Sequence, residues 1–457
     1  MSDIQDILPL LNKMDPKDTK DNILKYLESN SIDAWSNLDK ANIYTILGKY
    51  SLYTNEYSDT FFYFDLATKY FDPPYDDNKI SFLGDYYYHY ASLQIEIGNL
   101  LKARELGTLC IDYYNEKNDT KGQANALDLL SQIELRFLNL NEALDYAHKS
   151  IELYKSINGR LEISYTNIGE IYRIIGNLDL SLEYYEKAIK IAIENNDNYT
   201  LAINYNNLGL VYTELGVHES ALSYFQKSLE TFKLLNIFDI ECTIDYTECL
   251  IASYNISDSN KDKYIHKIEN NLINLRKNLF KTRSNILLFY FFNAIGHYEI
   301  KRNNFKAAEE YYLMSLNIAE NNGNLLLKIV IQTHLANWAL KQYNIDENSY
   351  FLEQSQNFHG KAKAIAIETM KPGLLAELMV LEAIIYSNLD IPKCKKILSE
   401  VLIYAQKNNN TRLIKKITGE STKISGKMVS GKNDLDLWDF QQYFNSIAKI
   451  TATNQEN

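Results

Sequence analysis

The stretch that decides the fold is Asn206–Phe225, NNLGLVYTELGVHESALSYF, because it places Gly209 inside an otherwise helical pattern. Glycine in a helix interior costs about 1 kcal/mol relative to alanine, so a packing contact must offset its presence. Nearly the same spacing occurs 40 residues earlier, in Thr166–Tyr185, TNIGEIYRIIGNLDLSLEYY. We therefore expect a repeated unit in which the glycine allows a close approach.

Four units carry this pattern strongly. Each has an aromatic residue three positions before a Leu-Gly or Ile-Gly pair, and a small residue 12 positions after the glycine. The glycines are Gly48, Gly169, Gly209 and Gly296, followed by Thr60, Ser181, Ala221 and Ala308. Each unit holds two stretches of helical periodicity split by a short turn. The spacing predicts two helices that cross closely at the small residues, with aromatic side chains filling the space beside the crossing.

Two further glycines have a different expected role. Gly176 and Gly216 lie near the end of the first helix of their units, where a residue with positive φ closes a helix. A single helix pair cannot bury its apolar face alone, so the pairs must stack on one another. The sequence therefore predicts an all-α fold, an α-solenoid of antiparallel helix pairs.

The pattern Tyr-x2-Leu-Gly-x2-Tyr…Ala-x3-Phe resembles the tetratricopeptide repeat (TPR), with tyrosine or phenylalanine where the family often has tryptophan. The resemblance covers about residues 41–405 and is strong in four units. It implies a TPR-like superhelix. The usual period of the family is 34, so a period near 40 implies longer helices or longer connections such as Asn195–Thr200. The proline that ends the family motif is generally absent here.

We expect five segments along the chain. The two ends should be polar caps, because the last repeat at each end has no neighbour. The expected segments are N-terminal capping helices at 1–40, TPR-like repeats at 41–240, a degenerate repeat or hinge at 241–285, TPR-like repeats at 286–416, and a loop with a C-terminal capping helix (436–450) at 417–457. A long insert, Gln342–Gln356, interrupts the next-to-last unit.

Composition and charge limit the classes of partner and the compartment that we expect. The net charge is −12, whereas a nucleic-acid binder usually carries a basic stripe, so no nucleic-acid partner is expected. The longest apolar run, Ile286–Gly296, is about half a membrane span, and the N-terminus has no signal-peptide pattern. Four scattered cysteines fit a reducing compartment. We expect a cytoplasmic protein with no membrane association; the oligomeric state stays open.

No motif indicates an enzyme, a metal or a cofactor. The seven histidines lack metal-ligand spacing, and Gly426–Asn433 only approaches a phosphate-binding loop, without its hydroxyl residue or a preceding strand. Cys242 and Cys249 would share one helix face, as a thiol site or, by preference, as buried small hydrophobes. Basic residues between Arg412 and Lys432 suit either an acidic partner or a solvated tail.

The resemblance to TPR proteins implies that partners bind the inner face of the first helix of each unit. Asparagine suits such a face because it offers a donor and an acceptor to an extended chain. The implied peptide- or partner-binding residues are Thr166, Asn167, Glu170, Arg173, Asn206, Asn207, Thr213, Asn293 and His297, with Thr45, Lys49 and Leu210 also facing inward.

Two functions follow from this expectation. The first is a non-enzymatic scaffold that binds a peptide or helical segment of a partner in the concave groove. The alternative is a peptide-sensing signalling regulator whose solenoid changes curvature on ligand binding. An enzyme with unrecognised chemistry has no supporting constellation of residues.

Overall fold

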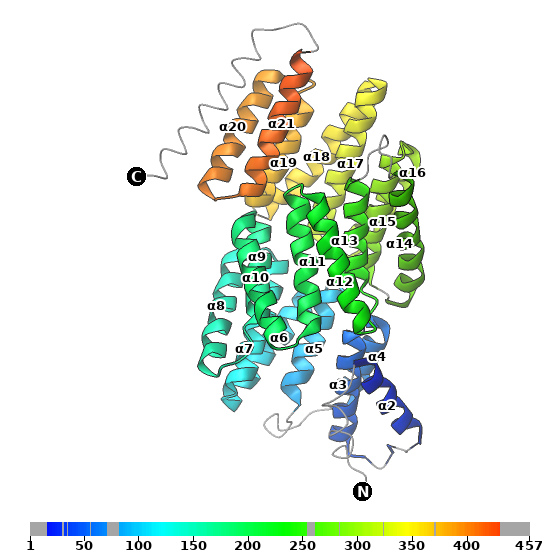
Figure 1. Ribbon diagram of the computed structural model, residues 1–457, viewed down its shortest axis with the longest axis vertical. Helices are drawn as coiled ribbons and strands as arrows, with labels where there is room; N and C mark the ends of the chain where they lie inside the picture. The colour runs from blue at the N-terminus through cyan, green and yellow to red at the C-terminus, as the bar shows by residue number, and fades with distance from the viewer. Residues whose placement is uncertain are drawn as a thin grey trace. The chain divides into compact units, whose positions relative to one another are not determined.

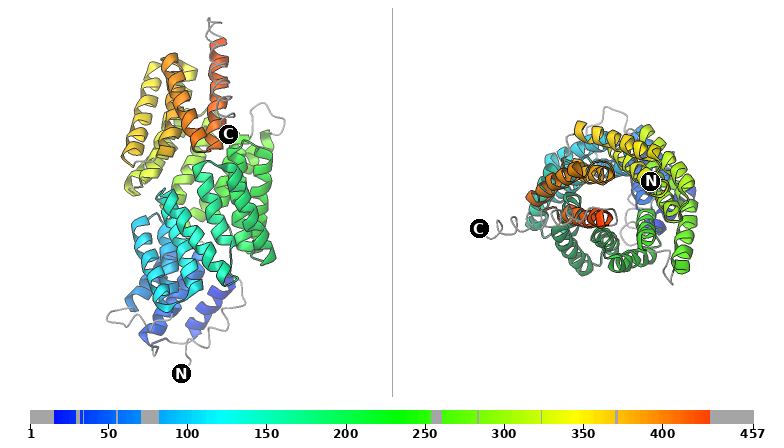
Figure 2. Two further views of the ribbon diagram at one scale, coloured as in Figure 1. Left: turned by 90° about the vertical axis from the view of Figure 1, so that its left-hand side faces the viewer. Right: turned by 90° about the horizontal axis from the view of Figure 1, so that it is seen from above.

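The computed structural model describes residues 16–29, 32–33, 35–54, 56–70, 82–253, 261–282, 284–322, 324–369 and 372–429. Every regular element in these ranges is an α-helix (Figure 1), and consecutive helices run antiparallel in pairs (Figure 2). The predicted all-α solenoid is therefore confirmed. None of the described helices is both long and apolar enough to cross a membrane.

The helices are α2 (Pro16–Ser29), α3 (Asn37–Tyr53), α4 (Tyr57–Tyr70), α5 (Leu83–Glu96), α6 (Leu100–Lys117), α7 (Thr120–Arg136), α8 (Leu140–Ser156), α9 (Glu162–Ile175), α10 (Leu178–Glu194), α11 (Asn198–Glu214), α12 (His218–Leu234), α13 (Ile240–Ser253), α14 (Lys261–Thr282), α15 (Asn285–Lys301), α16 (Phe305–Asn322), α17 (Leu325–Asp346), α18 (Ser349–Glu368), α19 (Pro372–Tyr386), α20 (Ile391–Lys407) and α21 (Thr411–Val429).

Each mid-helix glycine of the four strong units contacts an aromatic ring on the second helix of its pair. A Cβ on Gly209 would lie 2.6 Å from Cδ1 and Cε1 of Phe225, which is fully buried on α12. The same contact recurs in the other three strong units, as Gly48 with Phe64, Gly169 with Tyr185, and Gly296 with Tyr312. The sequence led us to expect the aromatic residues beside the crossing. The structure places the ring of the second helix directly on the glycine of the first.

Longer helices account for the 40-residue period. Helices α10, α11 and α12 have 17 residues each, and only residues 195–197 and 215–217 join them. Asn195–Thr200 is therefore not a long loop: Asp197 caps α11 by accepting from the Thr200 amide. Gly176 and Gly216 end α9 and α11 with φ of 89° and 71°, as predicted.

A second repeated contact joins the two helices of a pair. The hydroxyls of Ser150 and Ser228 donate to the carbonyls of Ala124 and Ala202, at 3.0 and 2.8 Å. The Cys110 thiol approaches the Gly84 carbonyl in the same way, at 3.6 Å. In each case the acceptor precedes the donor by 26 residues. The hydrogen-bonding groups of these small side chains are therefore paired inside a close-packed helix crossing, where a larger side chain would not fit.

Two segments differ from expectation. Residues 417–429, expected to be a loop, continue helix α21. Residues 342–356, expected to be an insert, lengthen α17 and α18, which are separated only by Glu347 and Asn348. Within residues 241–285, expected to be a degenerate repeat or a hinge, lie the helices α13 and α14. The predicted capping helix at 436–450 and the part of the N-terminal cap before Pro16 lie outside the described residues.

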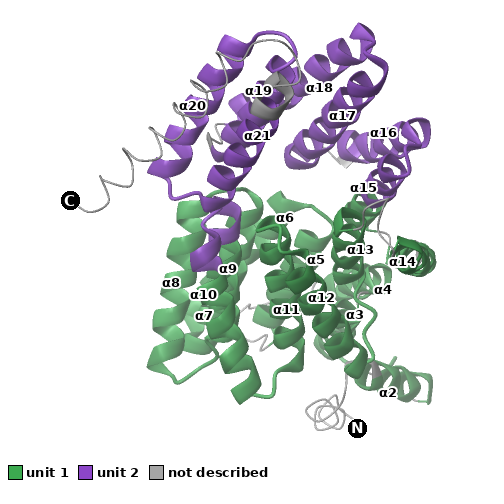
Figure 3. Cartoon of the chain, turned by 45° about the horizontal axis from the view of Figure 1, so that its top comes forward, with its two compact units in different colours: residues 1–171, 182–291 green, residues 172–181, 292–457 purple. Residues whose placement is uncertain are grey.

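The helices form two compact units (Figure 3). Unit 1 comprises Met1–Ile171 and Leu182–Phe291, and unit 2 comprises Tyr172–Ser181 and Phe292–Asn457. Within unit 1 the stack curls until distant pairs meet: α4 contacts α14, and the rings of Tyr53 and Tyr199 lie 6.3 Å apart. The helices of unit 1 therefore curve back on themselves, so that side chains far apart in the sequence come together.

Unit 2 includes the turn between α9 and α10 because that turn binds the start of α21. The Gly176 carbonyl accepts from the Arg412 amide and the Thr411 hydroxyl, both at 3.1 Å. The Leu178 amide donates to the same hydroxyl at 3.2 Å. Next to this contact, Glu377 pairs with Arg412 at 3.2 Å and with Lys416 at 2.8 Å. Part of the basic stretch 412–432 is thus neutralised within the fold.

We expect Glu377→Gln to destabilise the protein by about 1–3 kcal/mol near neutral pH, because two cations lose their partner. Burial opposes ionisation of Glu377, but Lys416 and Arg412 outweigh it and lower its pKa. The stability that this carboxylate supplies is therefore present at neutral pH and is lost as pH falls below its ordinary pKa of 4.5. Urea unfolding at neutral and acid pH measures the difference.

The control is Glu400→Gln, an exposed residue of α20, which should leave stability unchanged. A Glu377→Gln variant that lost the same stability at both pH values would contradict the assigned ion pairs.

Candidate partner-binding surface

The nine sequence-predicted binding residues lie on the first helices α9, α11 and α15. Each of them is buried or half-buried, so the inner face is more tightly packed than a solvated helix surface. Thr166, Asn167, Glu170, Asn206, Asn207 and Thr213 belong to unit 1, and Arg173, Asn293 and His297 belong to unit 2.

Two of the predicted asparagines join neighbouring first helices. Asn167 accepts from Nε2 of Gln132 at 3.2 Å and donates to the Asp128 carbonyl oxygen at 3.3 Å. Asn206 donates to Oδ2 of Asp245 at 2.9 Å. Its Oδ1 is buried and has no donor among the described residues. Asn206 thus carries one buried acceptor that no donor in this part of the chain satisfies.

Three other predicted residues make contacts within the stack. Thr166 accepts from Nδ2 of Asn204 at 2.8 Å, and the Thr213 hydroxyl donates to the Gly209 carbonyl at 2.9 Å. Glu170 accepts from the hydroxyl of Tyr185 at 2.8 Å. Tyr185 is the ring that packs on Gly169, so a change at Glu170 would also disturb the helix crossing.

In unit 2, Asn293 and His297 belong to an aromatic cluster, whereas the Arg173 carbonyl accepts from Nη1 of Arg412 at 3.4 Å. Nδ1 of His334 lies 3.1 Å from Oδ1 of Asn293, and the rings of His297 and His334 are 4.6 Å apart. Tyr312 packs within 6 Å of both rings. Burial, and then the neighbouring His297, lower the pKa of His334 well below its usual value, so its imidazole is neutral. Nowhere in the described ranges do three or more metal-ligating side chains come together.

The sequence did not lead us to a group of polar side chains in unit 1 that act on one another electrostatically, which we call the inner charge cluster: Glu96, Arg136, Glu241 and Tyr57. The hydroxyl of Tyr57 lies 3.4 Å from Oε2 of Glu96. Desolvation, and then Glu241, raise the pKa of Glu96 to about 7. The surrounding helices also desolvate Arg136, but Glu241 and Glu96 outweigh that effect and raise its pKa.

The sequence does hold a signal for this cluster. Glu96 and Arg136 each end a first helix and are one 40-residue period apart. Their electrostatic interaction with Glu241, however, depends on how the stack curls, which the repeat pattern does not specify. The cluster combines a guanidinium, two carboxylates and a phenol, groups that can recognise a polar peptide.

A buried carboxylate lies beneath this inner face. Asp128 is 1% exposed and accepts from the hydroxyl of Ser164 at 3.1 Å. Burial raises its pKa to about 7, and the hydrogen bonds from Ser164 and Asn167 only partly oppose that shift.

The cysteines are packing residues. Cys242 and Cys249 are each 1% exposed, which confirms their interpretation as buried small hydrophobes. Burial raises the pKa of both thiols, so they are poor nucleophiles at neutral pH.

The family follows from a match over two complete units. The tetratricopeptide repeat model matches residues 160–233, which contain helices α9 to α12 with Gly169 and Gly209. Residues 160–233 are thus tetratricopeptide repeats. No curated protein matches this TPR protein.

Solved structures resemble the TPR protein in fold. One is a Rap protein complexed with competence and sporulation factor, with a TM-score of 0.57 and 14% identity, covering 80% of this chain and 97% of that one. Another is the Rap conjugation gene regulator of plasmid pLS20 with the Phr* peptide, with a TM-score of 0.50, 13% identity, and coverage of 76% and 95%. The APC/C hetero-tetramer Cut9-Hcn1 has a TM-score of 0.50, 17% identity, and coverage of 79% and 58%.

Proposed function

We propose that this TPR protein is a non-catalytic, cytoplasmic scaffold that binds a peptide or helical segment of a protein partner on the inner face of its first helices. The observation that carries the proposal is the inner charge cluster of unit 1, where a guanidinium and two carboxylates from helices far apart in the sequence shift one another's pKa values. Polar groups held on rigid helices suit recognition of an extended chain.

Photo-crosslinking tests the location. A photoreactive amino acid at Asn207, an inner-facing residue of α11, should yield a discrete adduct with a partner in native cell extract. The matched control replaces Leu234, which is 79% exposed at the end of α12 and should give no such adduct. The same adduct from both positions, or none from Asn207, would place the partner elsewhere.

Charge reversal tests the inner charge cluster. Arg136→Glu adds a third carboxylate beside Glu96 and Glu241, and we expect it to weaken binding of the crosslinked partner by at least about tenfold. Arg136 is a better target than Glu170, whose carboxylate also holds Tyr185. Arg276→Glu, an exposed position on α14, is the control that should leave affinity unchanged.

The alternative function is a peptide-sensing regulator. It is favoured by the similar fold of two Rap proteins, one complexed with competence and sporulation factor and one with the Phr* peptide. A regulator of this kind changes curvature when it binds its peptide. Small-angle scattering with and without the bound partner segment separates the two functions: a change in radius of gyration supports the regulator, and an unchanged radius supports the scaffold.

A further inference from the structure

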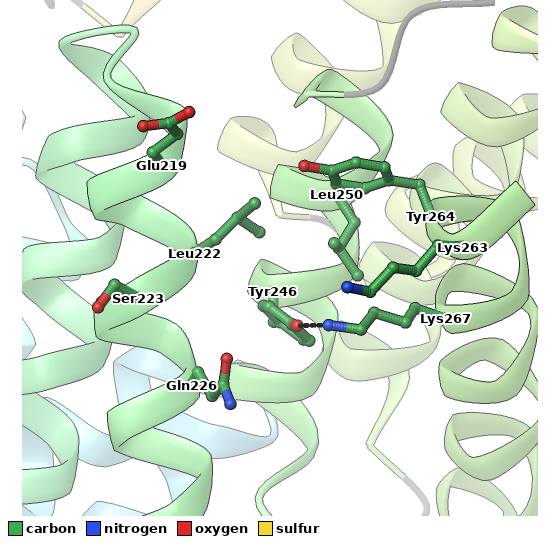
Figure 4. A pocket seen from close by; sticks show the side chains of 9 residues that line it. All are labelled: Glu219, Leu222, Ser223, Gln226, Tyr246, Leu250, Lys263, Tyr264 and Lys267. Carbon is green, nitrogen blue, oxygen red and sulfur yellow. Dashed lines mark hydrogen bonds between the residues drawn. The ribbon is translucent and has the colours of Figure 1, made fainter. Parts of the chain in front are cut away.

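Unit 1 contains a pocket of about 380 Å³ between helices α12, α13 and α14 (Figure 4). Its walls come from the second helices α12 and α14 and from Tyr246 and Leu250 of the first helix α13, and none of its lining residues belongs to the proposed partner-binding surface. The pocket is therefore a different surface. Its volume falls in the range of small-ligand sites.

The α14 wall is positively charged. Lys263 and Lys267 are four residues apart, and Figure 4 shows both side chains reaching from α14 toward Tyr246 and Leu250. Two like charges at this spacing repel each other, and cations are disfavoured near a helix N-terminus such as that of α14, which begins at Lys261. No carboxylate of the described ranges forms an ion pair with either ammonium group. An anion in the pocket would relieve this repulsion.

A buried hydroxyl lies beside the two lysines. Tyr246 is 9% exposed, and its hydroxyl accepts from Nζ of Lys267 at 3.3 Å. The proton of that hydroxyl has no acceptor within the described part of the chain, so it can be donated to a ligand. Two ammonium groups and one phenolic O–H thus offer donors to the same part of the pocket, which matches the several acceptor sites of a carboxylate.

The other residues that line the pocket limit the charge and polarity of a ligand that could bind there. The half-buried Leu222 supplies apolar surface, and the buried Leu250 lies behind it in the pocket lining. Glu219 lies on the opposite wall, on α12, well away from the two lysines in Figure 4. A second negative charge on the ligand would approach Glu219 and be repelled. The arrangement suits one anionic group on an apolar body.

We propose that this pocket binds a compact apolar group that carries a single carboxylate. The carboxylate lies between Lys263, Lys267 and the Tyr246 hydroxyl, and the apolar body packs on Leu222 and Leu250. Both a free carboxylic acid and the C-terminal residue of a peptide have this chemistry.

Titration calorimetry on the full chain tests the proposal with matched probes. The free-acid probe is 3-phenylpropionate, and the peptide probe is Ac-Gly-Gly-Phe with a free C-terminus. At least one should bind, and its amide (3-phenylpropionamide or Ac-Gly-Gly-Phe-NH2) should bind at least about tenfold more weakly, because hydrogen bonds to a charged group are lost. Which probe binds more tightly identifies the source of the carboxylate.

Two variants and one control locate the binding. Lys263→Gln combined with Lys267→Gln should weaken binding of the acid by at least about tenfold and leave its amide unaffected. Lys277→Gln, an exposed position farther along α14, should change neither. Ser223→Trp, on the exposed wall of α12, should block both probes without altering the core. Equal affinity for acid and amide, no binding of either acid at about 10 mM, or an unchanged double variant would each overturn the proposal.

Discussion

Gly209→Ala should destabilise the protein by about 1–3 kcal/mol, although alanine is the better helix former. The new methyl group would lie 2.6 Å from the buried ring of Phe225, so the ring or the helix must shift. Overpacking a well-filled crossing outweighs the propensity gain of about 1 kcal/mol. Urea unfolding followed by circular dichroism measures the change.

Gly360→Ala is the matched control. Gly360 also lies inside a helix, α18, but a Cβ there has no neighbouring atom within 4 Å. The same substitution should therefore stabilise the protein by about 0.5–1 kcal/mol. Changes in stability of opposite sign at the two positions would separate the effect of packing from that of helix propensity. If Gly209→Ala were also stabilising, the ring contact would not be the reason for the glycine.

Asp128→Asn should abolish a pH dependence that costs the wild type up to about 4 kcal/mol at alkaline pH. The pKa of Asp128 is about 7 in the folded state, against an ordinary value of 3.8. Between these values the folded protein holds one more proton than the unfolded chain. Stability therefore falls as pH rises from about 4 to about 7 and stays lower above that range.

The amide variant carries no charge at any pH, so the part of the slope that Asp128 causes should disappear, while the part that Glu96 causes remains. The substituted amide would keep the size of the side chain and could still accept from Ser164. The free energy of unfolding measured from about pH 5 to about pH 8 should fall less steeply in Asp128→Asn than in the wild type. Asp112→Asn, at an exposed position on α6, should retain the wild-type slope. An unchanged slope in Asp128→Asn would show that the carboxylate is not the source.

The fold could be read from the sequence because its decisive contacts are local. Gly209 and Phe225 are only 16 residues apart, and the same spacing recurs wherever a ring packs on a glycine in the four strong units. Helix ends were also readable where a glycine takes a positive φ, as at Gly176. The lengthening of α17 and α18 was not readable, because helical periodicity alone does not separate a longer helix from an inserted segment.

The candidate surface was only partly predictable. Family resemblance located the first helices, but it could not tell which inner side chains the stack itself engages. Asn167 is held by Asp128 and Gln132, whereas Asn206 keeps a buried acceptor. The inner charge cluster was missed because Glu241 lies far from Glu96 in the sequence, and only the curl of unit 1 brings their charges together.

The ring-on-glycine crossing also bears on how such a chain can grow. Each crossing is completed within one helix pair, as Gly169 and Tyr185 illustrate, and needs nothing from the rest of the molecule. A tandem duplication of about 40 codons would therefore add one complete helix pair, which could stack directly on the copy from which it arose. Adding whole helix pairs leaves every existing ring–glycine contact intact. An insertion or deletion of a few residues between the glycine and the aromatic residue of one pair would instead break that contact.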